Sequence, residues 1–336
     1  MSGGERVWVL ADPRAGTAAQ AIGIAERLGE PFRTIPLEWG PLARLPIPWP
    51  SLAGLTPPAR DALLAGAMEG RPAVPPGARP RVLSRWPDLV ISAGRRSGPV
   101  SRWLRRRGAR TVHCMRPGSG AADFDLLVIG RHDAPAPAPN VLPILGACHR
   151  LSPARLEAAR AEFPALADLP APRVALLVGG PVRGEGMPPN KADRLMSDVL
   201  RRYPSAGLML TTSRRTGEAA TAVIAAALAG RAHRLFRWGE AGANPYAGFL
   251  AWADAVVVTG DSVSMLSEAC ATAVPVLVAT QEAGRHAALV QSLYDAGQAW
   301  PLSGVPGNVA RQPLDESGRV AGEIVARGWL ADAGGT

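Results

Sequence analysis

Lysine is almost absent from this sequence, since Lys191 is the only one among 37 basic residues. Cysteine is scarce as well: the three cysteines lie far apart and form no CxxC pair, which argues against a zinc-binding or disulfide-linked scaffold. No apolar run approaches the roughly 20 residues that a membrane-spanning helix needs, and the N-terminal residues lack the layout of a secretory signal. These absences predict a soluble cytoplasmic protein with free thiols.

The positive charge of the chain comes from arginine. The formal net charge is +9 and the pI is near 10.7, a balance that is also typical of nucleic-acid binders. Glycine (37) and proline (33) are abundant too, and this combination indicates the codon bias of a GC-rich genome. We therefore expect no nucleic-acid partner, although the charge would attract an anionic ligand or membrane surface.

Both halves of the chain have the pattern of an α/β domain. With 336 residues, of which 47% are hydrophobic, the chain is long enough for two domains. Short β-rich runs alternate with helical patterns, which is typical of βαβ units and parallel sheets. The predicted fold is α/β, with two Rossmann-like domains facing a cleft. The predicted boundaries are 1–150 for the N-terminal domain, 151–172 for a linker helix and hinge, 173–312 for the C-terminal domain and 313–336 for a C-terminal helix and tail.

Hydrophobic runs bounded by glycine or polar residues mark the expected strands. In the first half they are Arg6–Ala11, Phe32–Leu37, Asp88–Ala93, Arg110–Met115, Asp125–Gly130 and Asn140–Leu145. In the second half they are Arg173–Val178, Gly207–Thr212, Arg234–Trp238, Ala255–Thr259 and Val274–Thr280. A single helix is expected over Leu151–Leu169. Ligands of open α/β sheets bind beyond the carboxyl ends of the strands, so the polar loops there are the candidate sites.

The strongest candidate is Thr259–Glu268 (TGDSVSMLSE), at the end of a strand in the second half. Asp261 or Ser262 can cap the following helix, whose free N–H groups and dipole would attract a phosphate. Glu268 lies one turn beyond Ser264 and near the same face, where a carboxylate suits the two hydroxyls of a ribose. The alternative is an ordinary capped helix with a surface glutamate.

Two further loops of the second half follow strands. One, in Leu208–Thr216 (LMLTTSRRT), places polar side chains together at a strand end: Thr211, Thr212, Ser213, Arg214, Arg215 and Thr216. The planar fork of a guanidinium matches diphosphate oxygens, and the alternative is a solvated turn. The other loop, Val178–Gly186 (VGGPVRGEG), carries Gly179 and Gly180, which let a backbone approach a ligand closely. It matches neither a Walker A motif nor GxGxxG.

Polar residues also follow strands in the first half. The candidate general bases are Asp12, His132 and Asp133, and the candidate acceptor-side residues are Arg14, Gly94, Arg95, Arg96 and His149. A carboxylate beside an imidazole can perform acid–base chemistry near neutral pH. A structural role is the alternative for each, and Asp133 could instead cap a turn. The five histidines are scattered and predict no metal site.

The basic stretch Ser101–Arg107 (SRWLRRR) carries Trp103. A helix of this composition can rest on anionic lipid with its tryptophan at the interface. The alternative is a solvated helix face.

Taken together, these segments resemble the mitochondrial-fission (elongated-mitochondria) family, which has many bacterial members and is regarded as glycosyltransferase-like. The motifs that carry the resemblance are Asp12–Gly16 with Gln20 and Gly23, Ser92–Arg96 (SAGRR), Phe124–Asp133 (FDLLVIGRHD), Gly146–Arg150 (GACHR), Thr211–Thr216 (TTSRRT) and Thr259–Ala269 (TGDSVSMLSEA). The resemblance covers nearly the whole chain, and the last two motifs are specific in combination.

The resemblance implies that the second domain is similar to the nucleotide-sugar domain of GT-B glycosyltransferases. In that superfamily an acidic residue at the position of Glu268 binds ribose, and the loop before it binds diphosphate. The implied site comprises Gly179, Gly180, Ser213, Arg214, Arg215, Asp261, Ser262, Ser264, Met265 and Glu268. The sequence departs from related transferases at Pro181, which removes one phosphate-facing N–H. It departs again at Ala11–Gly16, which lacks the Gly-Gly-x-Gly-His pattern, so the catalytic base cannot be carried over.

The function that the resemblance implies is metal-independent transfer of a sugar from a nucleotide diphosphate sugar to a cell-envelope glycan or lipid acceptor. No cofactor is expected beyond that substrate. The alternatives are a non-catalytic recruitment protein, since the plant branch is associated with mitochondrial division, and a nucleotide-sugar epimerase on the same scaffold. The expected location is the cytoplasm, with peripheral contact at the inner face of the membrane.

Overall fold

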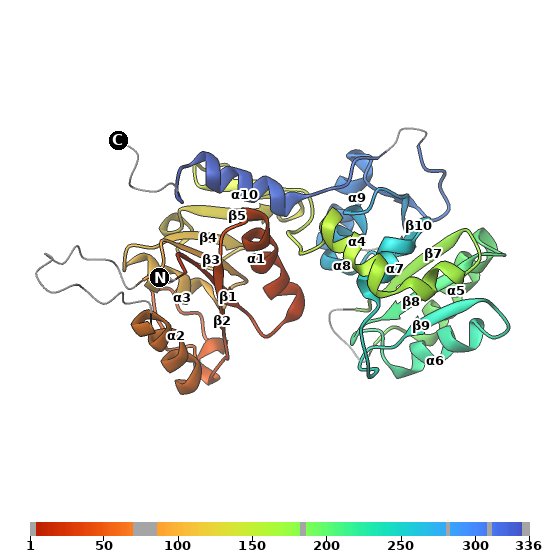
Figure 1. The fold of residues 1–336 in the computed structure, drawn as a ribbon, viewed down its shortest axis with the longest axis horizontal. Coiled ribbons are helices and arrows are strands. Elements are labelled where there is room, and N and C mark those ends of the chain that lie inside the picture. The colour runs from red at the N-terminus through yellow and green to blue at the C-terminus, as the bar shows by residue number, and fades with distance from the viewer. Residues whose placement is uncertain (1–4, 70–85, 182–185, 280–282, 308–310, 331–336) are drawn as a thin grey trace, which may run out of the picture. The chain divides into compact units, whose positions relative to one another are not determined.

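The chain folds into two compact α/β units. The computed structural model describes residues 5–69, 86–181, 186–279, 283–307 and 311–330. One unit comprises Met1–Arg150 with Glu316–Thr336, and the other comprises Leu151–Asp315. Each is built on a six-stranded sheet in which all paired strands are parallel (Figure 1). The α/β class with two Rossmann-like units is therefore confirmed.

The sheet of the first unit has the strand order β2-β1-β3-β4-β5-β6. Its strands are β1 (Val7–Ala11), β2 (Phe32–Pro36), β3 (Leu89–Ala93), β4 (Arg110–Cys114), β5 (Leu126–Gly130) and β6 (Val141–Ile144). Because side chains alternate along a strand, Val7 and Val9 pack into one hydrophobic cluster, whereas Trp8 and Leu10 pack into another. A strand buried on both faces reads as a continuous hydrophobic run, which is why the sequence predicts it.

Helices cover both faces of this sheet. They are α1 (Ala15–Leu28), α2 (Pro57–Glu69), α3 (Gly98–Arg105) and α10 (Glu316–Ala326). Ile24 of α1 and Ile324 of α10 share the cluster of Val9, whereas Leu104 of α3 belongs to the cluster of Leu10. The C-terminal helix α10 therefore completes the first unit beside α1 (Figure 1).

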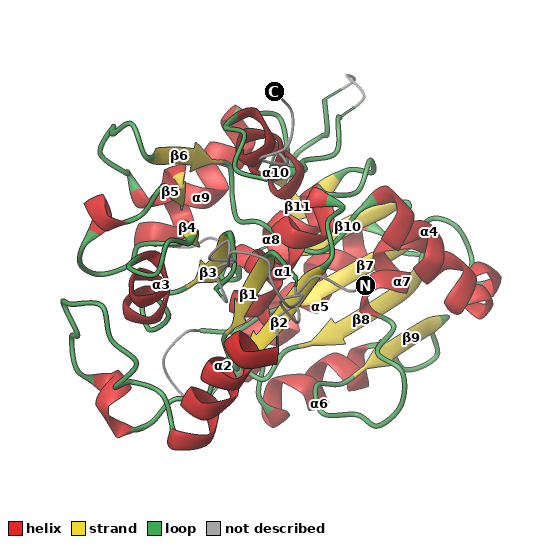
Figure 2. Ribbon diagram, turned by 60° about the vertical axis from the view of Figure 1, so that its left-hand side comes forward, coloured by secondary structure: helices red, strands yellow, loops and turns green. Residues whose placement is uncertain are grey.

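The sheet of the second unit has the order β12-β11-β10-β7-β8-β9. Its strands are β7 (Arg173–Val178), β8 (Gly207–Thr212), β9 (His233–Phe236), β10 (Ala255–Val258), β11 (Val276–Val278) and β12 (Trp300–Pro301). Figure 2 shows β7, β8 and β9 side by side. This order reverses direction between β7 and β10, and such a switch point is where ligands bind in open α/β sheets.

The helices of the second unit are α4 (Pro153–Glu162), α5 (Pro189–Arg202), α6 (Glu218–Ala227), α7 (Tyr246–Trp252), α8 (Val263–Cys270) and α9 (Gly284–Asp295). Along α5 the buried residues recur at helical spacing as Ala192, Leu195, Met196 and Val199, which seats one stripe of the helix on the sheet. No helix among the described residues is long and apolar enough to cross a membrane.

The prediction of a single helix over Leu151–Leu169 is wrong, because two separate helices lie there. Helix α4 ends at Glu162, and a separate 3₁₀ helix runs over Pro164–Asp168. Pro164 has no N–H to donate to the preceding turn, so the α-helix stops before it. Residues 151–172, expected as a linker, lie in the second unit, where α4 packs against α7.

Candidate functional site

Two loops meet at the switch point of the second sheet, one after β7 and one after β10. The Gly179 N–H donates to Thr259 Oγ1 at 2.8 Å. The same hydroxyl donates to Asp261 Oδ1 at 2.6 Å. Since strands β7 and β10 are hydrogen-bonded neighbours, Thr259 fixes the distance between the loops that follow them. The sequence did not single out Thr259 for this role, because the contact spans 80 residues.

Glycine is required in the β7 loop because neighbouring atoms leave no room for a side chain. A Cβ atom on Gly179 would lie 2.3 Å from Asp261 Oδ1, and one on Gly180 would lie 1.9 Å from the carbonyl oxygen of Arg215. The two glycines therefore serve the packing of three loops against each other. Residues 182–185, within the predicted glycine-rich loop, lie outside the described residues.

The loop after β8 is held to the same junction. The Thr216 hydroxyl donates to the carbonyl oxygens of Val178 and Gly179 at 2.9 and 2.7 Å. The Arg215 guanidinium donates to the carbonyl of Asp261 at 3.3 Å. The adjacent Arg214 is exposed. Of these two arginines, Arg215 is therefore the one that lies against the loop leading into α8.

Helix α8 begins at this junction. Ser262 is its N-cap, and its hydroxyl accepts from the N–H of Met265 at 3.4 Å. Ser264 and Met265 are half-buried in the first turn. The first N–H groups of a helix have no partner within the helix and carry partial positive charge, so this end of α8 can bind an anion.

Glu268 lies on the second turn of α8 and contacts α7. The Tyr246 hydroxyl donates to Glu268 Oε2 at 2.6 Å. Burial raises the pKa of Glu268 to about 7, while the hydrogen bond from Tyr246 and the charge of Arg155 act in the opposite direction. Burial and the neighbouring carboxyl group raise the pKa of Tyr246 well above its usual value, so Tyr246 remains a donor. The sequence did not reveal Tyr246, because the two residues are on different helices.

A cavity of about 1230 Å³ lies beside these loops and is lined in part by Gly180, Thr259 and Asp261. Residues three or four apart on α5 line another part of it: Lys191, Arg194, Leu195, Asp198, Arg201 and Arg202. Four of these six side chains are cationic, and Asp198 forms an ion pair with Arg201. The positive lining favours an anionic ligand. Helical spacing in the sequence could have shown that these cations share a face.

Asp12, a candidate base of the first unit, has both carboxylate oxygens engaged. Oδ1 accepts from the Arg14 N–H at 2.9 Å, and Oδ2 accepts from Trp39 Nε1 at 2.9 Å. Asp12 therefore ties the end of β1 to the segment after β2. Its assignment as a base stays a prediction.

The structure brings His132 and Asp133 together and buries His149. Nε2 of His132 lies 3.9 Å from Asp133 Oδ2, and the imidazole is almost fully buried over Gly130. The backbone N–H and carbonyl of His149 both bond to the Ser317 hydroxyl, at 2.9 and 2.7 Å. His149 thus anchors α10. Among the described residues, no three His, Cys, Asp or Glu side chains could together hold a metal ion.

The remaining acceptor-side residues flank β1 and β3, which are neighbours in the first sheet. Arg14 and Arg95 are exposed, and Arg96 is half-buried. Gly94 has a φ of 84°, which side chains rarely adopt. Arg95 and Arg96 line a cavity of about 130 Å³ at the carboxyl ends of the strands.

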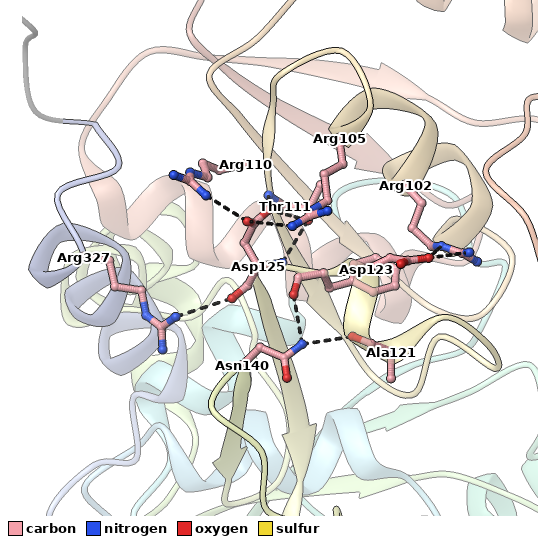
Figure 3. A network of polar contacts seen from close by, with 10 residues as sticks. Arg102, Arg105, Arg110, Thr111, Ala121, Asp123, Asp125, Asn140 and Arg327 are labelled. Atoms are coloured by element: carbon pink, nitrogen blue, oxygen red, sulfur yellow. Dashed lines mark hydrogen bonds and ion pairs between the residues drawn. The ribbon is translucent and has the colours of Figure 1, made fainter.

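The basic stretch Ser101–Arg107 comprises the C-terminal half of α3 and the turn after it, and the buried side of α3 packs on the sheet. Ser101, Arg102 and Leu104 are buried. Arg102 pairs with Asp123, and Arg105 pairs with Asp125 (Figure 3). Asp125 also accepts from Arg110 and from the N–H and hydroxyl of Thr111. Burial raises the pKa of Asp125, but these bonds together with the one from Arg105 outweigh it and lower the pKa.

Trp103, in the same stretch, contacts the ring of Trp86 and the guanidinium of Arg107. Its ring lies 5.4 Å from that of Trp86 and 3.1 Å from the guanidinium carbon of Arg107. Arg105 and Arg106 remain exposed, whereas Arg102, Trp103 and Arg107 make contacts within the unit.

The two parallel sheets, with a switch-point site in the second, define a two-unit Rossmann-like protein of the GT-B type. A family model described as "Mitochondrial fission ELM1" matches residues 15–328. The chain therefore belongs to the mitochondrial fission ELM1 family, which confirms the resemblance stated from its motifs.

Curated relatives agree with this membership. The chain is 29% identical over 279 residues to "Mitochondrial fission protein ELM1" of Arabidopsis thaliana, a match that covers 72% of this chain and 65% of that protein. It therefore spans slightly less than two thirds of the plant protein. It is 24% identical over 317 residues to "Uncharacterized protein RP120" of Rickettsia prowazekii, covering 81% and 82% of the two chains.

Solved structures share the fold at low sequence identity. Os79 from O. sativa, in complex with U2F and trichothecene, superposes with a TM-score of 0.56 at 12% identity, covering 96% of this chain and 91% of the other. UDP-GlcNAc 2-epimerase from Methanocaldococcus jannaschii superposes with a TM-score of 0.53 at 12% identity, covering 95% and 99%. These likenesses establish the fold and not the reaction.

Proposed function

We propose that the second unit binds a nucleoside diphosphate sugar and that the protein transfers the sugar to a cell-envelope glycan or lipid acceptor. The observation that carries this proposal is the convergence of the β7, β8 and β10 loops on the N-terminus of α8. There Arg215 supplies a guanidinium, α8 supplies N–H groups, and Glu268 lies one turn further along. Os79, which shares this fold, has been solved in complex with U2F and in complex with UDP, which supports this class of substrate.

In the proposed reaction the bond between the anomeric carbon and the diphosphate oxygen breaks. An acceptor hydroxyl forms the new glycosidic bond and gives its proton to a base. Negative charge develops on the departing diphosphate, and preorganised N–H groups of α8 with the Arg215 guanidinium would stabilise it. No metal or cofactor is part of the proposal. Asp12, His132 and Asp133 are the proposed bases.

A second candidate function is nucleotide-sugar binding without transfer, as expected of a recruitment protein. The observation that favours it is at Asp12, where both carboxylate oxygens already accept structural hydrogen bonds. A base must be able to take a proton from the acceptor. The two candidates differ in turnover and not in nucleotide affinity.

The test is calorimetric titration with UDP and uridine, followed by donor hydrolysis across a panel of nucleotide sugars. Arg215→Ala is expected to weaken UDP binding by about 1.5–3 kcal/mol, as for hydrogen bonds to charged groups, with little effect on uridine. Arg214→Ala is the matched control, because Arg214 is the exposed neighbour. If Arg215→Ala does not narrow the preference for UDP over uridine, the assignment of this loop fails. If the wild type binds nucleotide sugars but never hydrolyses or transfers one, the recruitment function replaces transfer.

A further inference from the structure

The loop formed by residues 41–50 (PLARLPIPWP) presents large apolar side chains to solvent. Leu42 is 50% exposed, Leu45 58% and Trp49 61%. The described part of the chain has seven exposed large hydrophobic residues, and three of them fall within these ten positions. Isolated exposed leucines are normal, but such a concentration indicates an interaction surface.

The outward position of these side chains is fixed by the loop itself. At its base, Trp39 forms a bridge with Leu55, and the Gly40 N–H donates to the carbonyl of Gly54 at 3.0 Å. At its far side, the Arg102 guanidinium donates to the carbonyl of Pro48 at 2.9 Å. Ala43 within the loop is buried, as are Leu52 and Leu55 just after it.

Prolines stiffen the loop further. Pro41, Pro46, Pro48 and Pro50 each fix a backbone dihedral. Leu42, Leu45 and Trp49 are therefore exposed on an ordered support, and little conformational freedom would be lost if a partner covered them.

Charge identifies the kind of partner. Within residues 41–50 the only charged side chain is Arg44, which is exposed. Residues 45–48 of the loop line the 130 Å³ cavity together with Arg95 and Arg96. The loop thus combines leucine and tryptophan side chains with flanking arginines and no carboxylate of its own. This composition suits the interface of an anionic bilayer, where tryptophan and leucine enter the headgroup region and cations pair with phosphates.

We propose that the 41–50 loop docks the protein on the surface of an anionic phospholipid bilayer, with Leu42, Leu45 and Trp49 inserted and Arg44 and Arg95 at the phosphates. The proposal replaces Ser101–Arg107 as the membrane-facing element, because that stretch is packed and ion-paired. It also places the Arg95–Arg96 cavity at the lipid surface. The proposal depends on neither nucleotide binding nor sugar transfer, and vesicle binding is measured without either.

The experiment is sedimentation of the full chain with vesicles of phosphatidylcholine alone or mixed with phosphatidylglycerol. The variant replaces Leu42, Leu45 and Trp49 by serine, and the matched control is Val325→Ser, which changes a side chain of the same unit that is 61% exposed. We expect the wild type and the control to bind the anionic vesicles, with weaker binding at high salt. We expect the triple variant to bind at least tenfold more weakly.

A second measurement reports the loop directly and does not depend on the triple variant folding. The native cysteines at 114, 148 and 270 are buried, so a polarity-sensitive fluorophore can be attached at Leu45→Cys and, as control, at Val325→Cys. Nine tryptophans make intrinsic fluorescence too crowded for this purpose. We expect a blue shift on anionic vesicles at position 45 and none at position 325.

Three results would overturn the proposal. The first is wild-type protein that does not bind anionic vesicles, and the second is a folded triple variant that binds them as the wild type does. The third is a wild-type dimer that the triple variant converts to a monomer, with no blue shift on vesicles, because a second copy of the chain would then cover the loop.

Discussion

At the scale of single residues, Glu268 is a carboxyl group whose charge changes near neutral pH. Burial raises its pKa to about 7 even though the Tyr246 hydroxyl donates to it. Because the pKa is raised, the ionised form dominates only above that pH. Ribose hydroxyls that donate to the carboxylate would stabilise the ionised form, so nucleotide binding and loss of this proton are linked.

We predict that UDP affinity increases about tenfold between roughly pH 6 and pH 8, which is the increase in the ionised fraction of a group with a pKa near 7. Glu268→Gln is expected to remove this increase and to weaken binding at the higher pH. Calorimetry over that range measures both effects. The variant also serves as the control for titration of the UDP phosphate, so a pH dependence that survives the substitution contradicts the role of Glu268.

His113 is a buried imidazole that makes stability depend on pH. It shares a hydrogen bond of 2.8 Å with the Ser92 hydroxyl and stacks on Phe124 with ring centres 4.8 Å apart. Burial lowers its pKa from 6.5 to about 3. Between pH 6.5 and about pH 3 His113 is therefore protonated in the unfolded chain and neutral in the folded chain. The free energy of unfolding consequently falls as the pH drops below 6.5.

We predict that the first unit loses about 2 kcal/mol of stability through His113 between roughly pH 6.5 and pH 5, at about 1.4 kcal/mol per unit of pH. His113→Asn is expected to lower stability near neutral pH but to flatten this acid dependence. Urea unfolding at several pH values measures it. His233→Asn, which changes an exposed imidazole, should keep the wild-type slope; equal slopes in all three proteins would refute the prediction.

At the scale of elements, the β7 loop depends on a backbone contact that only glycine permits. A Cβ on Gly180 would lie 1.9 Å from the Arg215 carbonyl oxygen, and backbone cannot move aside as a flexible side chain can. We predict that Gly180→Ala destabilises the second unit by about 1–3 kcal/mol, the range for overpacked sites, and weakens UDP binding. Thermal unfolding and calorimetry measure the two effects.

Gly322→Ala on α10 is the matched control for that substitution. A Cβ there meets nothing within 4 Å, and alanine in a helix is favoured over glycine by up to about 1 kcal/mol. The control should be at least as stable as the wild type. Wild-type stability and UDP affinity in Gly180→Ala would show that the loops are not packed as described.

Helices and strands could be predicted from the sequence where a single pattern, such as an uninterrupted hydrophobic run, dominates. Strands such as Arg173–Val178 and Gly207–Thr212 have the predicted bounds, because strands buried on both faces are uninterrupted hydrophobic runs. Strand β12 was not predicted, since Trp300–Pro301 is too short to form a pattern. The break at Pro164 was missed because helical spacing continues on both sides of it.

Fewer features of the candidate site than of the fold could be predicted from the sequence. Asp261, Ser262 and Arg215 could be named because they directly follow predicted strands. Tyr246 and Thr259 could not be given their roles, because their bonds join segments that only the folded sheet brings together. The same holds for His149, whose backbone is bound by a serine 168 residues further along.

At the scale of the whole molecule, the chain leaves the first unit at Arg150 and returns to it at Glu316. Hydrogen bonds from its first turn hold the returning helix: the Leu145 N–H donates to Glu316 Oε1 at 2.8 Å, Ser317 bonds to His149, and Arg319 donates to the carbonyl of Pro143. Ile324 of α10 is fully buried in the cluster that includes Ile24 of α1. The first unit thus lacks part of its core until the last helix has docked, whereas the second unit is continuous in sequence.

This connectivity predicts that a core change in α10 lowers the stability of the first unit alone. Ile324→Ala should destabilise it by about 2–5 kcal/mol, the range for removing a large buried aliphatic side chain. Its neighbour Val325 is 61% exposed, so Val325→Ala should have little effect.

In scanning calorimetry we expect two unfolding transitions. Ile324→Ala should lower the temperature of one, and saturating UDP should raise the temperature of the other. UDP affinity should be unchanged in Ile324→Ala, because the loops proposed to bind the nucleotide belong to residues 151–315. A single transition that both perturbations shift would mean that the units unfold together and that α10 stabilises more than the unit it completes.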